Sequence, residues 1–421
     1  MKIGLISFHS FSQPGGVKNH ILGLHKEFQK MGIEAKIIAP RRHLGENYGP
    51  DVILLGTSFP VNFHGTRSDF CVNFNAPAIE KILRAEKFDI LHYHNFGFPS
   101  AFQIMEKSTA LNILTFHANV RGSKFLKTFP GFFYLFKKII QWKMDGIIGV
   151  ADLNLKFFKG YKGPKAVIPN GVDLLEFNPR IPKINKFRDG KINILFTGRI
   201  EERKGLIYLL QAYNLLQSSH HNLRLIIVGD GKLKEDYEQW TRENNLKNVC
   251  FEGEVEQAKL PAYFTTADIF VSPAIHGESF GIVLVEAMAS GTPIVAFANL
   301  GYRKLLEGGR GGECLVPNKN FKALAGKIET LIKNKDRRQE MGKWGIEEAQ
   351  KYSWPKVCRD VLAFYELCRK NKENKETFLP LSETEIILKE IDRILEKKIL
   401  DKKDILGWKK DIIGWLKKKN L

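Results

Sequence analysis

Short apolar runs alternate with amphipathic segments along most of this chain. The first run, from Ile3 to Phe8, has the length and continuity of a strand buried on both faces. A turn of small and polar residues follows and leads into a predicted helix whose apolar side chains recur at helical spacing. They are Val17, Ile21, Leu24, Phe28 and Met31. A buried strand followed by a covering helix is the repeating unit of a parallel α/β sheet.

The same alternation continues through both halves of the sequence. In the first half, further strands are expected at Ala35–Ala39, Val52–Leu55, Asp89–His94, Asn112–Phe116 and Gly146–Val150. In the second half, they are expected at Ile192–Thr197, Leu223–Val228, Val249–Phe251, Ile269–Ser272 and Pro293–Phe297. The polar stretch from Pro179 to Gly190 separates the two sets and is expected to be a linker. We therefore predict an α/β fold with two Rossmann-like, doubly wound parallel-sheet domains.

One predicted helix has no polar face. The residues from Ile282 to Ala289 are apolar on every side except at Glu286, which predicts a buried helix. A carboxylate inside a buried helix is costly unless a polar group meets it, so Glu286 requires a ligand or a structural partner. The residues just before the helix include Gly277, Ser279 and Gly281, where free N–H groups favour an anion. The alternative is a core helix whose glutamate pairs with a buried arginine or lysine.

A cationic loop follows the first strand of the second half. It runs from Gly198 to Gly205 with the sequence GRIEERKG. Ligands bind outside the carboxyl ends of strands in open α/β sheets, and arginine and lysine side chains there suit a diphosphate. Charged residues at the start of a helix are otherwise usually surface residues. Arg203 occupies an additional position in this loop and is expected to face solvent.

Three histidines lie on or after predicted strands. The segment LNILTFHAN places His117 where an apolar strand ends, at the edge where ligands bind; the alternative is a hydrogen-bonded structural histidine. His92 and His94 alternate along another strand, and we expect them to point to opposite faces. That expectation argues against one metal held by both. Since no convincing D-x-D motif is present either, no metal site is predicted.

The composition adds a strong positive charge. The net charge is +19 and the pI is about 9.5, so nucleic acids, anionic lipid headgroups and phosphorylated substrates are all attractive partners. No nucleic-acid-binding motif is recognisable. The five cysteines are scattered and odd in number, which predicts reduced thiols in a cytosolic protein. No run approaches the roughly 20 apolar residues of a spanning helix, so any membrane contact is expected to be peripheral.

Two segments combine lysines with aromatic residues. Arg121–Lys143 is one, and the C-terminal stretch Asp404–Lys418 is the other, with Trp408 and Trp415 on an apolar stripe between lysine pairs. Aromatic residues at the apolar edge with lysines on the polar side are typical of helices at a membrane surface. Packing on the protein, a helical hairpin or dimerisation are equally open alternatives.

Several motifs together resemble one enzyme family. Glu278 and Glu286, within ESFGIVLVEAMASGTP, have the spacing of the E-x7-E motif of retaining nucleotide-sugar glycosyltransferases of the GT-B fold, in particular glycosyltransferase family 4. PGGVKNH, TFHAN and IPNGVD are similar to the family's N-terminal loop, histidine motif and domain junction. The match in the first two and in ESFG resembles the phosphatidylinositol mannosyltransferases. The resemblance covers about residues 1–370.

The resemblance implies a role for each motif residue. Arg199 and Lys204 would bind the phosphates, and Gly15 and Gly16 would face the diphosphate across a cleft. Glu286 would hold the ribose hydroxyls, Glu278 the sugar hydroxyls, and His117 would contact and orient the transferring sugar. The remaining donor-binding residues would be Gly229, Val255, Ser279, Phe280 and Gly281. His117, Glu278, Arg199 and Lys204 would be the catalytic residues.

The resemblance also implies an organisation and an activity. Residues 1–185 would form the acceptor-side domain, residues 186–351 the nucleotide-sugar domain, and residues 352–370 a crossover helix that returns to the first domain. This leaves residues 371–421 as a basic amphipathic helical tail. The implied reaction is retaining transfer of a hexose from GDP-mannose or a UDP-sugar to a lipid or glycan acceptor. It would occur at the cytosolic, inner face of the cell membrane, without a cofactor or metal.

Three alternatives remain open at this point. A GT-B fold also serves phosphorylases and nucleotide-sugar epimerases, although no pyridoxal-binding lysine signature is evident. A non-enzymatic basic protein that binds membranes or nucleic acid is the third. Mutations at Glu278 or Lys204 would leave the binding function of such a protein unchanged.

Overall fold

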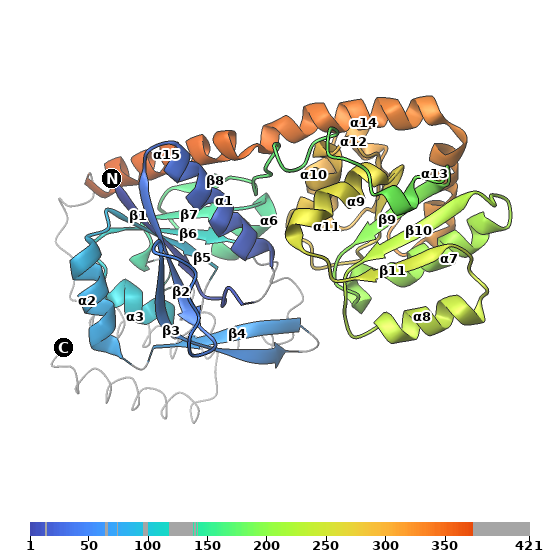
Figure 1. Ribbon diagram of the computed structural model, residues 1–421. Helices are drawn as coiled ribbons and strands as arrows, with labels where there is room; N and C mark the ends of the chain where they lie inside the picture. The colour runs from blue at the N-terminus through green and yellow to red at the C-terminus, as the bar shows by residue number, and fades with distance from the viewer. Residues whose placement is uncertain are drawn as a thin grey trace, which may run out of the picture.

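Two parallel β-sheets, each with its own helices, are the framework of this chain (Figure 1). The computed structural model describes residues 1–12, 15–63, 66–73, 75–95, 100–117, 138, 140 and 142–373. The first sheet is built from residues 2–167 and the second from residues 192–316. The predicted pair of doubly wound α/β domains is therefore confirmed.

The first sheet has eight strands in the order β4-β3-β2-β1-β5-β6-β7-β8. They are β1 (Lys2–Ser7), β2 (Glu34–Arg41), β3 (Val52–Phe63), β4 (Thr66–Val72), β5 (Ile90–His94), β6 (Leu111–Phe116), β7 (Gly146–Gly149) and β8 (Lys165–Val167). The helices are α1 (Gly16–Lys30), α2 (Ala76–Glu86), α3 (Ser100–Lys107) and α6 (Asp152–Leu155), followed by the 3-10 turn η1 (Lys156–Phe158). The chain runs outward from β1 in both directions, so the carboxyl end of β1 is a topological switch point where ligands bind.

The edge of the first sheet differs from the prediction. β3 continues eight residues beyond the predicted end at Leu55, and β4 pairs with it antiparallel. Pro60 lies in this extension, and a proline inside an apolar run argues against a strand. The extension is tolerated because β2 pairs with β3 only as far as Thr57, so Pro60 needs no ladder bond on that side.

The second sheet has six parallel strands in the order β11-β10-β9-β12-β13-β14. They are β9 (Ile192–Thr197), β10 (Leu223–Val228), β11 (Val249–Gly253), β12 (Ile269–Ser272), β13 (Ile294–Phe297) and β14 (Leu315–Val316). The helices are α7 (Leu206–Gln217), α8 (Lys234–Glu243), α9 (Leu260–Thr266), α10 (Ile282–Ala289), α11 (Leu300–Leu306), α12 (Gly309–Gly312), α13 (Phe321–Lys333) and α14 (Lys335–Ala349). The 3-10 turns are η2 (Asn185–Phe187), η3 (Glu202–Lys204), η4 (Gln257–Lys259) and η5 (Gln350–Tyr352). β9 is the switch point of this sheet.

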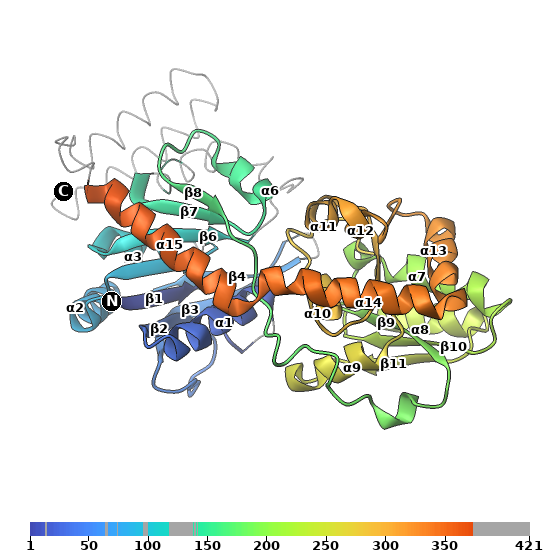
Figure 2. The ribbon, with the colours of Figure 1, turned by 90° about the horizontal axis from the view of Figure 1, so that it is seen from above.

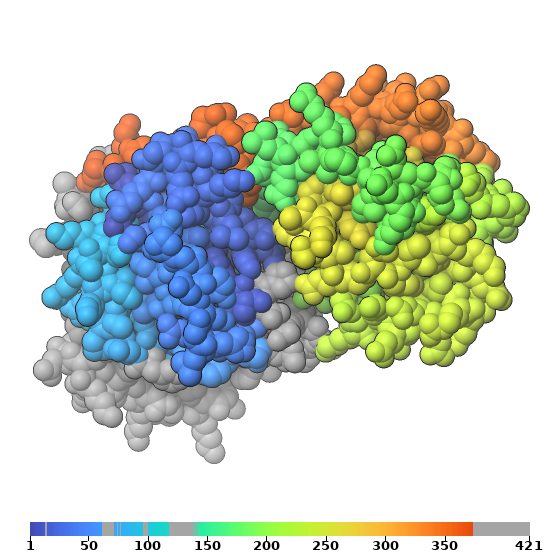
Figure 3. Space-filling view, in the orientation of Figure 1, coloured from blue at the N-terminus to red at the C-terminus, as the bar shows by residue number. Residues whose placement is uncertain are grey.

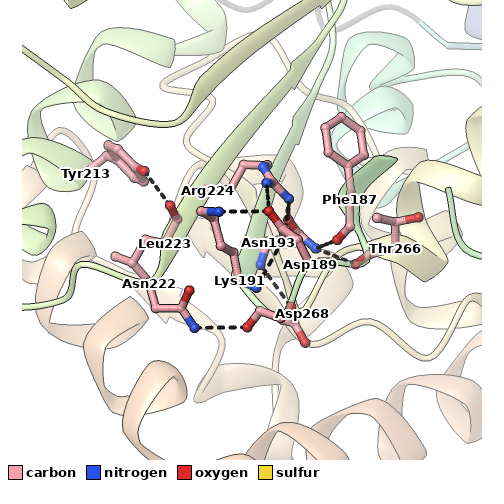
Figure 4. Close-up of polar contacts among 11 residues, drawn as sticks. Phe187, Asp189, Lys191, Asn193, Tyr213, Asn222, Leu223, Arg224, Thr266 and Asp268 are labelled. Carbon is pink, nitrogen blue, oxygen red and sulfur yellow. Dashed lines mark hydrogen bonds and ion pairs between the residues drawn. The ribbon is translucent and has the colours of Figure 1, made fainter. Parts of the chain in front are cut away.

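A polar network ties the linker to the amino ends of β9 and β10 (Figure 4). Arg224 donates through Nη1 to Asp189 Oδ1 at 3.0 Å and to Asn193 Oδ1 at 3.2 Å. The Arg224 guanidinium holds the pKa of Asp189 well below its ordinary value. Because this network is at the amino ends of the strands, it supports the domain from the edge opposite to the one where ligands bind.

The last helix crosses from the second domain to the first (Figure 2). α15 (Trp354–Glu373) follows α14 and η5, and its apolar face packs with α1 and the first sheet. Val172 N–H donates to the Tyr352 carbonyl at 2.8 Å, and Lys372 Nζ is 3.1 Å from Asp145 Oδ2. The Lys372 ion pair ties the last turn of α15 to the first sheet, and α15 ends three residues beyond the predicted end of the crossover helix at residue 370.

Trp354, the first residue of α15, fills a slot that two glycines leave open. A Cβ atom at Gly23 would lie 2.1 Å from the indole ring, and one at Gly171 would lie 2.4 Å from it. Real Cβ atoms do not approach that closely, so the slot requires glycine on both sides. Gly23 is inside α1 and Gly171 is in the domain junction, so the indole joins three segments.

None of the helices in the described ranges is long and apolar enough to cross a bilayer. All five cysteines are free thiols, and all but Cys250 are buried.

Candidate active site at the domain junction

The two domains meet side by side (Figure 3). A cavity of about 210 Å3 lies at their junction. α1 contributes Gly16, His20 and Lys26 to its lining. The junction contributes residues 170–173 and 176–177, and α10 contributes Ile282 and Glu286. The structure therefore brings the N-terminal glycine loop and the glutamate of the buried helix to one cavity.

Gly15 and Gly16 are glycines that packing does not require. A Cβ atom at either would meet nothing within 4 Å, and both residues are exposed. α1 begins at Gly16, so its free N–H groups are at the cavity. Small residues without a packing role at a helix N-terminus leave room for an anion to approach the main chain.

Glu286 is buried and carries a strongly perturbed carboxyl group. Burial, together with the nearby Glu176 carboxylate and against the opposing charge of Lys204, raises its pKa to about 8. Within the described part of the chain, its carboxyl group has no hydrogen bond or ion pair. The side chain lines the cavity, so its oxygens are available to a ligand with hydroxyl groups.

Glu278 lies in a different electrostatic environment. Its Oε1 atom is 2.8 Å from Lys204 Nζ and 3.0 Å from Arg203 Nη1. Burial raises the pKa of Glu278, but the two cations outweigh burial and hold that pKa below its ordinary value. Glu278 is therefore ionised at neutral pH, whereas Glu286 largely keeps its proton.

The prediction that Arg203 faces solvent was wrong. Its side chain is only 20% exposed, and its Nε atom is 2.7 Å from Glu201 Oε1 while Nη1 contacts Glu278. The physical reason is that a buried carboxylate needs more than one donor to offset its lost hydration. The Arg199 side chain, by contrast, is 55% exposed. Its Nη2 atom is 3.7 Å from Glu201 Oε1, a longer distance than the 2.7 Å of the Arg203 contact. Arg199 is the more loosely held cation of the loop.

Glycines in the loops after β10 and β12 allow main chains to pack directly. At Gly229, φ is 134°, and a Cβ atom would lie 2.0 Å from the Gly198 carbonyl oxygen. At Gly281, which caps α10, φ is 98°, and a Cβ atom would lie 2.6 Å from the Tyr302 ring. These loops surround the carboxyl ends of β9 and β12, where a ligand is expected.

The other predicted donor-binding residues differ in what they can offer. Phe280 is 7% exposed and its ring packs on Tyr352 with centroids 5.4 Å apart, so only its main chain can reach a ligand. Ser279 and Val255 are half-buried in the loops after β12 and β11.

Histidines from three elements of the first domain form a cluster. His117 follows β6, and its Nε2 atom is 3.3 Å from Nδ1 of His94 on β5. The ring of His20 on α1 stands edge-on to His117, with centroids 4.7 Å apart. The His92 and His94 rings are 4.2 Å apart, so the prediction that they point to opposite faces was wrong. Residues two apart on a strand share a face.

The clustered imidazoles are neutral. Burial lowers the pKa of His20 and of His92 to about 3, and it lowers the pKa of His94 and His117 well below the ordinary value. One ring nitrogen from each of His20, His94 and His117 lies within 4.8 Å of the others. Neutral imidazoles that close are suitable ligands for a transition metal. That no metal is required therefore stays a prediction.

Sequence reasoning missed several residues at the junction. Glu176 carries no recognisable chemical motif, and the sequence placed Tyr352 and Trp354 in the crossover helix without giving either side chain a role. The two basic aromatic segments lie outside the described residues, which leave out most of Arg121–Lys143 and all of residues 374–421, the second segment Asp404–Lys418 included.

Comparison with known proteins gives consistent matches over both halves. Residues 14–175 match the family model Glycosyltransferase Family 4, and residues 177–348 match Glycosyl transferases group 1. The chain is 33% identical over 390 residues to a phosphatidyl-myo-inositol mannosyltransferase from Mycobacterium leprae, covering 87% of this chain and 96% of that protein. The Mycolicibacterium smegmatis protein of the same name is 31% identical over 375 residues, covering 87% and 94% of the two chains.

The fold has counterparts among solved structures. Sucrose-phosphate synthase from Thermosynechococcus elongatus superposes with a TM-score of 0.70 at 20% identity. The match covers 87% of this chain and 98% of that one.

Proposed function

The chain belongs to the glycosyltransferases of family 4 and group 1, and on that premise we propose that it moves a hexose from a nucleoside-diphosphate sugar to a lipid. The observation that carries the proposal is the composition of the junction cavity. Gly16 and the α1 N-terminus border it from the first domain, and Glu286 borders it from the second. Lys204 is close enough to influence the Glu286 carboxyl group electrostatically.

The cationic loop suits the charge that develops in such a reaction. When the bond to the sugar breaks, negative charge moves onto the diphosphate, and fixed cations and N–H groups stabilise it. We assign Arg199, Lys204 and the N–H groups at Gly15 and Gly16 to this role. Arg199 is free to turn because it is largely exposed.

Lys204 is already paired with Glu278 before a donor binds. The Glu278 carboxylate and the donor phosphates would therefore compete for Lys204, and Arg203 makes it possible for Lys204 to leave Glu278. When Lys204 turns to the phosphates, Arg203 still compensates the Glu278 charge through its 3.0 Å hydrogen bond. Glu278 then remains an ionised acceptor for sugar hydroxyls.

The two remaining roles follow from burial and position. Glu286 would accept hydrogen bonds from the ribose hydroxyls, and His117 would contact the transferring sugar from the first domain. Because these groups come from both domains, closure over the donor would complete the site and exclude water. The retaining course, with the leaving phosphate accepting the acceptor's proton on the same face, is carried over from the family resemblance.

An anionic lipid is the acceptor that the chain's charge favours. The net charge of +19 attracts anionic membrane surfaces, and the curated relatives are named for phosphatidyl-myo-inositol. We therefore propose GDP-mannose as the donor, phosphatidylinositol as the acceptor, and a peripheral position on the inner face of the cell membrane. Deleting residues 401–421 should weaken sedimentation with anionic liposomes without changing nucleotide binding. Unchanged sedimentation would give the tail a packing role instead.

Product analysis tests the transfer itself. The purified chain is incubated with radiolabelled GDP-mannose, UDP-glucose or UDP-N-acetylglucosamine and with phosphatidylinositol liposomes, and the lipid phase is extracted and counted. Label should enter the lipid with one donor, and it should not do so with the Lys204→Ala variant. Absence of labelled lipid with every donor, although one nucleotide raises the melting temperature, would refute the proposed acceptor.

A further inference from the structure

We propose that the crossover segment from Tyr352 to Tyr365 positions His117 through the two imidazoles packed against it and fixes which ring nitrogen of His117 carries the proton. The proposal rests on the proposed function in one respect, that His117 contacts the transferring sugar. Tyr352, Trp354 and Tyr365 belong to η5 and α15, which link the nucleotide-binding domain to the first sheet.

The first path begins at Tyr365 on α15. Its buried hydroxyl is 2.7 Å from Nδ1 of His92, and Nε2 of His92 is 2.6 Å from the Thr115 hydroxyl. Both nitrogens of His92 are therefore hydrogen-bonded, which fixes the plane of this ring on β5. The His94 ring is next to it, with centroids 4.2 Å apart, so the first ring limits how the second can turn.

The second step fixes the proton on His117. His94 Nδ1 and His117 Nε2 share one hydrogen bond at 3.3 Å, and both rings are neutral. His94 Nε2 is buried and has no hydrogen-bond partner among the described residues. A buried N–H without an acceptor is rarer than an unused lone pair, so the His94 proton belongs on Nδ1. His117 Nε2 is then the acceptor, and Nδ1–H is the donor that His117 keeps.

A second path to His117 runs through Trp354 and His20. The indole is edge-on to His20 with centroids 5.4 Å apart, and the His20 ring is edge-on to His117 at 4.7 Å. Gly23 and Gly171 enclose the indole so closely that it has no room to shift. Two short paths of packed rings that both begin on the crossover segment therefore meet at the triangle of His20, His94 and His117.

The same segment also reaches the donor loop. Tyr352, two residues before Trp354, packs against Phe280 at 5.4 Å. Phe280 lies between Glu278 and α10, which carries Glu286. A single stretch of chain therefore contacts both the histidine cluster of the first domain and the loop that carries Glu278 in the second.

Tyr365→Phe removes the hydroxyl that orients His92 and keeps the packed ring. We expect kcat for sugar transfer to fall about tenfold while KM for the donor changes less than about twofold, because a small misplacement of a reacting group lowers turnover. Tyr161→Phe is the matched control. It removes another buried hydroxyl of the first domain, which donates to the Met144 carbonyl at 2.7 Å and does not contact the cluster. Equal turnover in the two variants would refute the positioning role.

His94 gives a second, conservative comparison. His94→Asn keeps an N–H donor near the position of Nδ1, whereas His94→Leu removes it. The asparagine variant should retain several times the kcat of the leucine variant at equal melting temperature. If the two lose turnover equally, the hydrogen bond to His117 has no role beyond packing.

The proton position can be measured without any turnover. In the 15N-histidine-labelled full chain, long-range 1H–15N spectra should show His117 as the Nδ1–H tautomer and His94→Leu should shift it toward Nε2–H. An Nε2–H tautomer in the unaltered protein would overturn the assignment. If the spectra agree but the protein transfers no sugar, the proposed function fails and the positioning of His117 stands.

Discussion

Glu286→Gln should remove a loss of stability that the wild-type chain undergoes as pH rises. The glutamate is buried beside the cavity, and burial raises its pKa to about 8 from an ordinary value of 4.5. Because the folded chain holds this proton more tightly than the unfolded chain, the free energy of unfolding falls as pH rises between those two values. Glutamine has the same size and no charge at any pH, so the variant lacks this loss.

The size of the effect follows from the two pKa values. They differ by about 3.5, and each pKa unit corresponds to about 1.4 kcal/mol, which gives an upper bound of about 5 kcal/mol. The cavity beside the carboxyl group is large enough for several water molecules, so we expect the effective dielectric constant to be higher than in a dry core. We expect a measured difference of about 2–3 kcal/mol above pH 8 and almost none near pH 5.

Urea unfolding followed by tryptophan fluorescence at pH 5, 6, 7, 8 and 9 measures this difference at fixed ionic strength. Glu254→Gln is the control, since Glu254 is exposed in the loop after β11. The wild type and this control should lose stability together as pH rises, and Glu286→Gln should become the most stable of the three. Parallel curves for all three proteins would show that Glu286 is already ionised, and the electrostatic description of the cavity would then be wrong.

Three further outcomes follow from the same geometry. Lys204→Ala should abolish sugar transfer and leave the melting temperature within a few degrees, and near-normal turnover would remove Lys204 from the site. Gly23→Ala should lower the free energy of unfolding by about 1–3 kcal/mol, because its Cβ would meet the Trp354 ring at 2.1 Å. Gly326→Ala is the control, and it should be neutral or stabilising because nothing lies within 4 Å of its Cβ. Equal effects of the two substitutions would show that the indole does not need glycine at position 23. Turnover should survive prolonged treatment with EDTA, and activity that is lost and then restored by one added metal would make the histidine cluster a metal site.

The repeating elements could be predicted from the sequence because they are local patterns. Every strand expected in the two halves is present, and the apolar run around Glu286 forms the buried helix α10. The predicted strand boundaries are less accurate at the edge of the first sheet, where β3 continues past Leu55 to Phe63. Proline disfavours a strand, and only the observed pairing shows that β2 leaves β3 after Thr57, so that Pro60 has a ladder partner on the β4 side alone.

The candidate site was predictable where one motif carries the chemistry and not where distant residues meet. Gly16 and Glu286 were both singled out, and the structure brings them to one cavity. Arg203 was misplaced because its partner Glu278 is 75 residues away in the chain. The indole slot between Gly23 and Gly171 has no sequence signal at all, since an isolated glycine is consistent with many environments.

The central claim is that a nucleoside-diphosphate sugar binds between the two domains. A crystal structure of the chain with intact donor, collected before turnover, tests it most directly. The account predicts the diphosphate against Arg199, Lys204 and the α1 N-terminus, the ribose at Glu286, and the sugar between Glu278 and His117. A donor bound anywhere else, or with its ribose away from α10, would contradict it.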